Sequence, residues 1–264
     1  MKRYVIGICL LALAALVLAT GPATARETET INQSYPVGRD ARLSLKNVNG
    51  DVTIEGSDAD RFEVTAVKSA DSKKRLDDVE VRLRMDGDHL SIEVDMDEHL
   101  WSRHNHESLR VDFTVRVPRS ARIDAVELVN GDLELRNITG DVDASSVNGD
   151  VTGEALGGSV ELSAVNGGVS LLANGNAESI DLSSVNGGVK LVLPKKIDAR
   201  IEANTVHGSI RSSDGLDVDT SSFVGSSLKG TIGKGGMKIE LDTVNGSIEI
   251  RREGDAPARG REED

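Results

Sequence analysis

The sequence predicts an all-β protein built as a parallel β-solenoid, with a less regular N-terminal β region acting as a cap. Three observations support this class. A hydrophobic residue followed by Asn-Gly recurs through the C-terminal half, at Val129-Asn130-Gly131, Val147-Asn148-Gly149, Val165-Asn166-Gly167, Val185-Asn186-Gly187 and Val244-Asn245-Gly246. The first three intervals are about 18, 18 and 20 residues, a period typical of stacked repeats. Outside the first 25 residues no segment has a helical apolar stripe, and the chain is rich in Gly and poor in aromatic residues.

Residues 1–25 are predicted to be a secretory signal peptide. Met1-Lys2-Arg3 is positively charged, residues 4–19 are almost wholly apolar, and Ala23-Thr24-Ala25 has the small-x-small form of a cleavage site. An uncleaved anchor is the alternative. Cys9 follows the bulky Ile8 within the apolar run, which argues against a lipid-modified cysteine. We therefore expect export to the periplasm, cell surface or medium, without stable membrane insertion after cleavage.

The composition of the exported part limits its partners. Removing Lys2 and Arg3 lowers the basic residues from 31 to 29 against 44 acidic ones, so the net charge falls from −13 to −15. Such a chain repels nucleic acid and anionic lipid. Because Cys9 is the sole cysteine, no disulfide or thiolate nucleophile remains after cleavage. The charged segment from Arg251 to Asp264 is predicted to be a disordered tail.

Regular repeats are predicted over residues 121–250. Apolar residues fall at the second, fourth and seventh positions of each half-repeat, as in Leu133, Leu135 and Ile138, or Val142, Ala144 and Val147. We interpret the first two as one buried strand face and the third as a turn that leads the chain inward. Alternate halves all contain nine residues, namely Gly140 to Asn148, Gly158 to Asn166, Glu178 to Asn186, Ala199 to His207, Leu216 to Val224 and Met237 to Asn245. The other halves vary in length, so one corner is constant and the opposite corner accepts insertions.

Asn-Gly also favours a two-residue hairpin, so an antiparallel meander is the alternative to parallel coiling. The consistent difference between alternate turns favours the parallel coil. In that coil Asn130, Asn148, Asn166 and Asn186 would stack about 4.8 Å apart and form hydrogen bonds along the axis. His207 would replace Asn in the next rung.

Residues 26–120 are predicted to form the N-terminal β region. Leu43, Leu45, Asn49-Gly50, Val52 and Ile54 match the repeat, which places a first rung at residues 41–55. The strand-like stretches that follow are interrupted by polar segments, and we interpret them as an insertion or cap that shields the end of the solenoid.

The chain resembles the bacterial secreted β-strand-repeat proteins labelled "putative adhesin", whose domain is also called toastrack or adhesin-head. The matching residues are Val111 to Pro118, Val126 to Leu133 and the serial Ser-Val-Asn-Gly turns, and the resemblance covers roughly residues 40–250. It implies a right-handed, single-stranded, parallel β-helix-like fold in an envelope or surface protein of mostly unknown function. It transfers no catalytic residue.

Two groups of residues are candidates for binding. His99, His104 and His106, with Asp95, Asp97 and Glu98, could hold a divalent ion, and Trp101 could stack on a sugar. A plain polar loop with Trp101 covering the core is the favoured interpretation. Lysines and arginines also gather toward the C-terminal repeats, near Leu172 and Val192, where an anionic partner could bind, although scattered solubilising residues are favoured; they are Lys190, Lys195, Lys196, Arg211, Lys229 and Lys234.

Outward positions of the nine-residue halves are predicted to form an acidic face. These positions carry Asp141, Asp143, Glu161, Asp181, Glu202, Asp217, Asp219, Glu240 and Asp242. They lack the Gly-Gly-x-Gly-x-Asp pattern of calcium-binding repeats, so a solvated face is favoured over a calcium site. Asp217 and Asp219 could serve as the acid and base of a polysaccharide-cleaving enzyme, but no nucleophile elbow or phosphate loop accompanies them.

We therefore predict an exported structural or interaction protein of the cell envelope that has no catalytic residue, cofactor or metal site. A metal- or glycan-binding module and a polysaccharide-active enzyme remain the alternatives. The expected partner is an envelope protein or a polysaccharide.

Overall fold

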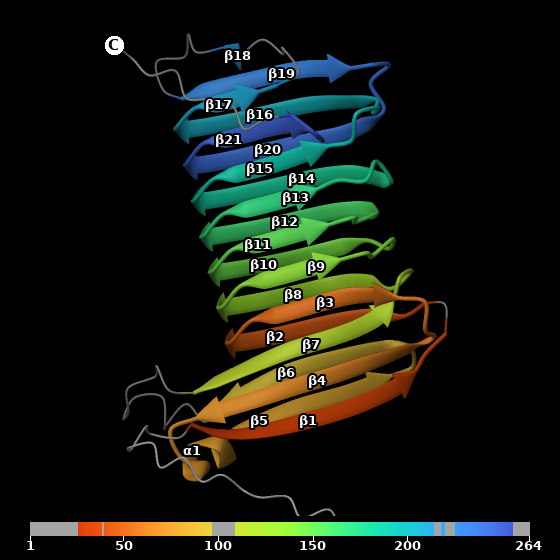
Figure 1. The fold of residues 1–264 in the computed structure, drawn as a ribbon, viewed down its shortest axis with the longest axis vertical. Coiled ribbons are helices and arrows are strands. Elements are labelled where there is room, and N and C mark those ends of the chain that lie inside the picture. The colour runs from red at the N-terminus through yellow and green to blue at the C-terminus, as the bar shows by residue number, and fades with distance from the viewer. Residues whose placement is uncertain (1–25, 39, 97–108, 214–217, 220–224, 256–264) are drawn as a thin grey trace, which may run out of the picture.

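The computed structural model describes residues 26–38, 40–96, 109–213, 218–219 and 225–255, which form two long sheets facing each other along one axis (Figure 1). Sheet A has the strand order β1 (Glu27–Pro36), β4 (Arg61–Ala70), β7 (Arg110–Pro118), β3 (Val52–Ser57), β9 (Leu133–Arg136), β11 (Val151–Glu154), β13 (Val169–Leu172), β15 (Val189–Leu193), β21 (Ile248–Arg252), β17 (Ile210–Ser212). Sheet B has the order β18 (Val218–Asp219), β19 (Ser226–Ile232), β16 (Ala199–His207), β20 (Met237–Asn245), β14 (Ala177–Asn186), β12 (Gly158–Asn166), β10 (Val142–Asn148), β8 (Arg122–Asn130), β2 (Arg42–Asn49), β6 (His89–Met96), β5 (Val79–Asp86). One short helix, α1 (Lys73–Asp77), is described near the N-terminal end of the stack. The predicted all-β class is confirmed.

From β8 to β15 the chain alternates between the two sheets, and each strand from β8 to β13 pairs in parallel with the strand two positions later. The register places Asn148 beside Asn130 and Asn166. This part of the chain is therefore not an antiparallel meander. The structure describes no helix with the length and apolar character that crossing a membrane requires.

Both sheets are mixed rather than wholly parallel, because antiparallel pairs form at the two ends of the stack. At one end β4 pairs antiparallel with β1 and β7, and β5 with β6. At the other end β19 pairs antiparallel with β16 and β18. Consequently Val218 and Asp219, within the predicted half Leu216 to Val224, do not belong to a parallel rung. End rungs have no further neighbour, and hairpins cover edges that would otherwise expose unpaired backbone groups.

The spatial order of rungs departs from the sequence order. The last rung, β20 and β21, lies between the rung of β14 and β15 and the rung of β16 and β17. Asn186 therefore pairs with Asn245, and His207 lies one rung further on. The expectation that His207 follows Asn186 directly is wrong. At the other end, β2 and β3 pair with β8 and β9, as the predicted first rung at residues 41–55 requires.

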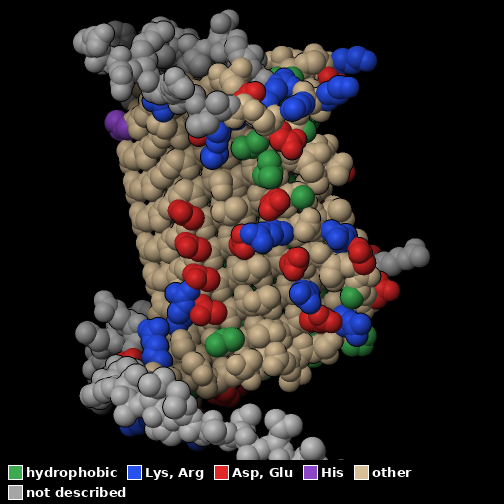
Figure 2. All heavy atoms as spheres, viewed as in Figure 1, with side chains coloured by type: hydrophobic (Ala, Val, Ile, Leu, Met, Phe, Trp, Pro, Cys, Tyr) green, Lys and Arg blue, Asp and Glu red, His purple; other side chains and the backbone are tan. Residues whose placement is uncertain are grey.

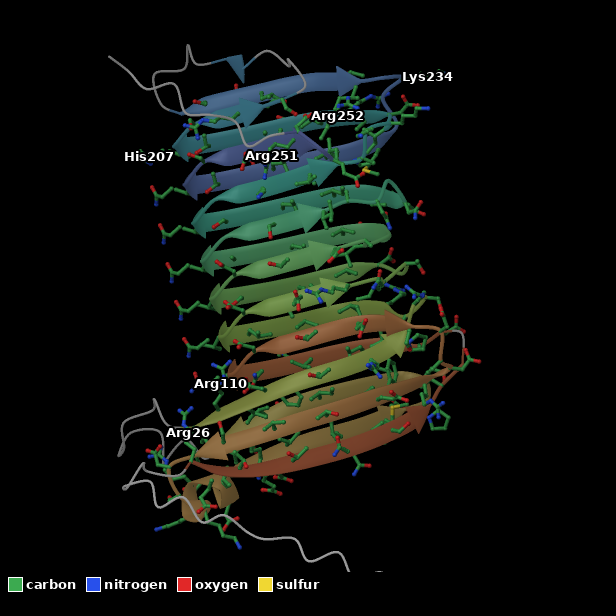
Figure 3. All side chains as sticks on the ribbon, in the orientation of Figure 1. Arg26, Arg110, His207, Lys234, Arg251 and Arg252 are labelled. Carbon is green, nitrogen blue, oxygen red and sulfur yellow. The ribbon has the colours of Figure 1, made fainter. Side chains whose placement is uncertain are left out.

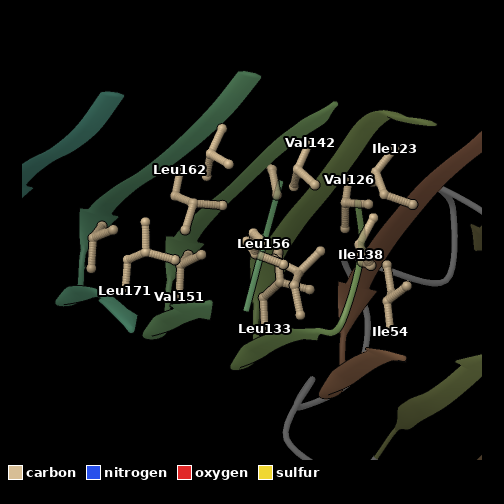
Figure 4. Packing of buried hydrophobic residues seen from close by; sticks show 14 of the residues in the cluster. Ile54, Ile123, Val126, Leu133, Ile138, Val142, Val151, Leu156, Leu162 and Leu171 are labelled. Atoms are coloured by element: carbon tan, nitrogen blue, oxygen red, sulfur yellow. The ribbon is translucent and has the colours of Figure 1, made fainter. Parts of the chain in front are cut away.

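The core is a narrow layer of aliphatic side chains between the sheets. Strand alternation sends every second residue inward, as in Val142, Ala144 and Ser146 of β10, which are at most 2% exposed. Figure 4 shows the residues of the two sheets facing each other, with Ile138 and Leu156 from the variable corner between them. The interpretation of the seventh position is correct for these two residues but wrong for the nine-residue halves. Val147 is 40% exposed, because β10 continues in strand conformation to Asn148.

The Asn-Gly corner is held by a ladder of asparagine hydrogen bonds and by the close approach of glycine backbones in neighbouring rungs. Successive asparagine side chains donate Nδ2–H to the Oδ1 of the next at 2.7–2.9 Å, in the order Asn245, Asn186, Asn166, Asn148, Asn130 and Asn49. The predicted hydrogen bonds along the axis are confirmed and extend by one asparagine at each end. A Cβ on Gly167 would lie 2.0 Å from the carbonyl oxygen of Gly149, so only glycine permits this strand spacing.

The N-terminal region closes the stack. Lys68 of β4 is 6% exposed, and its ammonium group donates to the carbonyl oxygens of Leu76 (3.0 Å) and Val79 (3.2 Å) and forms an ion pair with Glu29 (2.8 Å). These contacts tie α1, β1 and β5 to β4. At the other terminus, β21 extends to Arg252, so Arg251 and Arg252 belong to a strand and not to the predicted tail.

Candidate interaction surface

A column of valines runs along the outer face of sheet B, next to the Asn-Gly corner. Strand alternation points each one outward, and each is 40–41% exposed. In spatial order they are Val129, Val147, Val165, Val185, Val244 and Val206. In the part of the chain that the structure describes, Leu172 is the one other large hydrophobic residue exposed to this extent. We call these six residues the valine column; at about 4.8 Å per rung it is about 24 Å long.

A shallow groove of about 690 Å³ runs beside the valine column across five rungs. Behind the groove, on the inward face of the sheet, lie hydroxyl groups that are already satisfied, since Ser146, Ser184 and Thr243 donate to glycine carbonyl oxygens of the neighbouring rung at 2.8–3.1 Å. Ser145 and Ser163 stand on the outward side, and β19 contributes to one end. We call this feature the sheet-B groove.

The acidic column borders the groove on the side away from the corner. It consists of carboxylates in matching register on five neighbouring strands, Asp143, Glu161, Asp181, Glu240 and Glu202. On each strand the carboxylate lies two residues before the outward groove residue and four before the valine, so the acidic column and the valine column are about 13 Å apart, with the groove residues midway between them. The predicted acidic face is confirmed at these positions.

Burial and mutual repulsion raise the pKa values of two carboxyl groups in this column. Burial, followed by the charges of Glu161 and Glu127, raises the pKa of Asp143. Burial also raises the pKa of Asp181, with Glu161 as the next contribution. At the far end Lys229 pairs with Glu202 at 2.7 Å and Lys238 with Glu240 at 2.8 Å. Within the described residues no ion pair engages Asp143, Glu161 or Asp181.

A second acidic ladder follows the same corner on sheet A and is structural. Asp112, Asp51 and Asp132 each accept the backbone N–H at the corresponding corner position of the next rung, at 2.8–2.9 Å, and Asp150 accepts the N–H of Gly168 at 2.7 Å. Arg110 pairs with Asp51 and Asp112 at one end. Figure 2 shows acidic side chains in a column on this side of the molecule, and Figure 3 shows Arg110 and His207 at the edge where the corners lie. These carboxylates hold the turns and do not form an open site.

Several sequence candidates lie outside the described residues: His99, His104, His106, Trp101, Asp97, Glu98 and Asp217, together with the side chain of Asp219. Asp95 is described in β6, where it pairs with Arg82. Among the residues with a described structure, no group of three or more His, Cys, Asp or Glu side chains is arranged to hold a metal ion. The metal and enzyme hypotheses therefore remain untested predictions.

The C-terminal basic residues are divided among several surfaces. Lys229 lies on sheet B, whereas Lys190 and Arg211 lie on sheet A in register with Glu249. Lys195 and Lys196 line a separate depression of about 830 Å³ at the variable corner, together with acidic residues. The structure thus does not bring the six predicted residues into one patch.

Comparison with known proteins gives a family for most of the repeats. Residues 125–251 match the family described as Toastrack DUF4097, which confirms the resemblance. A solved structure from Clostridium sporogenes, described as a "putative cell adhesion protein", is similar with a TM-score of 0.53 and 15% identity, over 86% of this chain and 100% of that one. A "putative adhesin" from Bacteroides fragilis has a TM-score of 0.42 and 14% identity, over 85% of this chain and 97% of that one. At such identities the first likeness supports the fold alone. No curated protein matches the chain.

Proposed function

Because residues 125–251 match the Toastrack family, we propose that the chain is an exported interaction protein of the cell envelope and that the outer face of sheet B is its contact surface. Residues 1–25 direct export and are cleaved near Ala25, leaving residues 26–264 in the periplasm or on the cell surface. The coil is right-handed, as crossovers between parallel strands almost always are. The chain acts by binding and not by catalysis.

The valine column is the observation that carries this proposal. An isolated exposed valine is ordinary, whereas apolar side chains aligned over six rungs form a continuous strip of the kind that marks a protein contact site. Stacking of identical β-branched residues also stabilises the sheet, which explains why valine suits each position locally. Threonine, which is also β-branched, would stabilise the sheet equally well, so sheet stability does not explain why the strip lacks polar side chains.

The ladders on either side of the corner make this surface rigid. Each rung is joined to the next by asparagine side chains, aspartate caps and backbone bonds. A partner that docks on the column therefore meets side chains already fixed in position, and little conformational entropy is lost on binding.

An adherence measurement tests the proposal. Fluorescently labelled residues 26–264 are incubated with envelope preparations of the organism that makes the protein, and bound label is quantified. Replacing Val147, Val165 and Val185 by Thr keeps side-chain shape and strand propensity while removing the apolar strip. We expect adherence to fall about 10-fold for this triple variant, and to stay within twofold of wild type for Leu172→Thr, which alters an equally exposed residue on sheet A. Equal adherence of all three proteins would refute the proposal.

A further inference from the structure

We propose that the sheet-B groove binds an extended polypeptide segment in which basic and apolar side chains alternate. This inference rests on the proposed function and names the class of partner that the surface recognises. It follows from the chemistry of the two columns that border the groove.

The groove offers opposite chemistry on its two sides. The valine column supplies an apolar side, and the acidic column supplies carboxylates in the same rungs about 13 Å away. An extended segment lying along the stacking axis between them points successive side chains to opposite sides. One set of side chains would then meet valines and the other carboxylates.

The charge on the acidic side calls for a cationic partner. Asp143, Glu161 and Asp181 occupy consecutive rungs, and among the described residues none of them is in an ion pair. Their burial and repulsion raise the pKa values of Asp143 and Asp181, so ionised neighbours carry an energetic cost within the free protein. A lysine or arginine side chain placed over this column would relieve that repulsion.

The surroundings of the groove favour polypeptide over other polymers. Sugar rings bind by stacking on aromatic side chains, but Phe62 and Phe113 are at most 2% exposed and no aromatic residue lines the groove in the described part of the chain. Nucleic acid would place phosphates against carboxylates. The groove crosses about five rungs, a length matched by roughly seven extended residues.

A labelled peptide of four Lys-Val repeats is the probe, and its affinity for residues 26–264 is measured by fluorescence anisotropy at low and physiological salt. We expect saturable 1:1 binding that weakens with salt. Replacing Glu161 by Gln together with Asp181 by Asn should weaken binding about 10-fold, since two carboxylates next to the peptide are neutralised. The Val147, Val165 and Val185 to Thr variant should weaken it by a similar factor.

Matched controls lie on the opposite sheet. Glu154→Gln removes an exposed carboxylate from β11, and Leu172→Thr removes an exposed apolar side chain from β13. Both should leave the affinity within twofold of wild type. Four Lys-Gly repeats should bind at least about 10-fold more weakly than Lys-Val, because they lack the apolar side chains.

Three results would overturn the inference. If the affinity falls in the Glu161 and Asp181 variant but not in the valine variant, the binding is non-specific charge attraction. Loss of binding in the sheet A controls would place the contact elsewhere. Failure of the peptide to bind, or tighter binding of a cationic glucosamine oligomer, would exclude a polypeptide of this kind as the partner. The proposed function would still be tested separately by the adherence measurement.

Discussion

Replacing Gly167 with Ala provides a sharp test of the stacking geometry. The added Cβ would lie 2.0 Å from the carbonyl oxygen of Gly149, whereas ordinary contact begins near 3.4 Å, so the two rungs must separate by more than 1 Å at this corner. That separation breaks the 3.1 Å hydrogen bond from the Gly149 N–H to the carbonyl oxygen of Asn166 and the 2.9 Å bond from Asn166 Nδ2–H to Asn148 Oδ1. With about 1–3 kcal/mol for overpacking and about 1 kcal/mol for each hydrogen bond, we expect a loss of about 3–5 kcal/mol in the free energy of unfolding.

Gly168 is the matched control because it is the next residue. Its Cβ would lie 3.3 Å from the carbonyl oxygen of Gly188, and its φ is not in the left-handed region, so a shift of a few tenths of an ångström accommodates alanine. We expect Gly168→Ala to change stability by less than about 1 kcal/mol. Urea unfolding of residues 26–264, followed by far-ultraviolet circular dichroism, measures both variants. Equal stabilities for the two, or a Gly167→Ala loss below about 1 kcal/mol, would refute the reasoning.

Four further substitutions probe the asparagine ladder, the acidic column and the N-terminal cap. Asn166→Ala removes two side-chain hydrogen bonds and Asn49→Ala removes one, so urea unfolding should show losses of about 1–2 and 0.5–1 kcal/mol; equal losses would contradict the continuous ladder. Burial raises the folded-state pKa of Asp181, so its contribution to stability falls as pH rises above the ordinary pKa of 3.8. Asp181→Asn should therefore raise the thermal midpoint at pH 7 and lose that advantage below pH 3.8. A difference in midpoint that stays constant across pH would count against this. Lys68→Met removes the hydrogen bonds that the carbonyl oxygens of Leu76 and Val79 accept from the ammonium group and should cost about 2–4 kcal/mol in urea unfolding, whereas an unchanged midpoint would show that the ammonium group adds nothing to the cap.

The asparagine ladder could be predicted because identical turns recur at a nearly constant period. Parallel stacking then places Asn148 beside Asn166, and each amide has both a donor and an acceptor to pass on. The register of the acidic column follows from the same period, as Glu161 and Asp181 show.

The order of the last rungs could not be inferred from the interval alone. Asn186 could be followed by either His207 or Asn245, since both end nine-residue halves with the same apolar pattern. The amide chemistry was the available signal: an asparagine continues a ladder of Nδ2–H to Oδ1 bonds, and an imidazole ends it. Long-range strand choice of this kind depends on tertiary packing and not on local sequence.

The sequence pattern does not by itself predict the valine column, because apolar residues occur at the same spacing before both corners of the repeat. Ile138 is buried because the chain turns inward after β9, and the same spacing predicts an inward-facing Val147. Alternation within β10 would have placed Val147 on the same face as Asp143 and Ser145. The candidate surface was thus present in the pattern, but its direction depended on where the strand ends.

Thiol footprinting tests most directly whether the outer face of sheet B contacts the partner. Residues 26–264 contain no cysteine, so Val165→Cys and Leu172→Cys each introduce a single exposed thiol, one on each sheet. The rate of alkylation is measured with and without saturating envelope preparation. A contact on the outer face of sheet B should slow alkylation at least about 10-fold at position 165 and leave it unchanged at position 172. Protection of position 172 with free reaction at position 165 would contradict it.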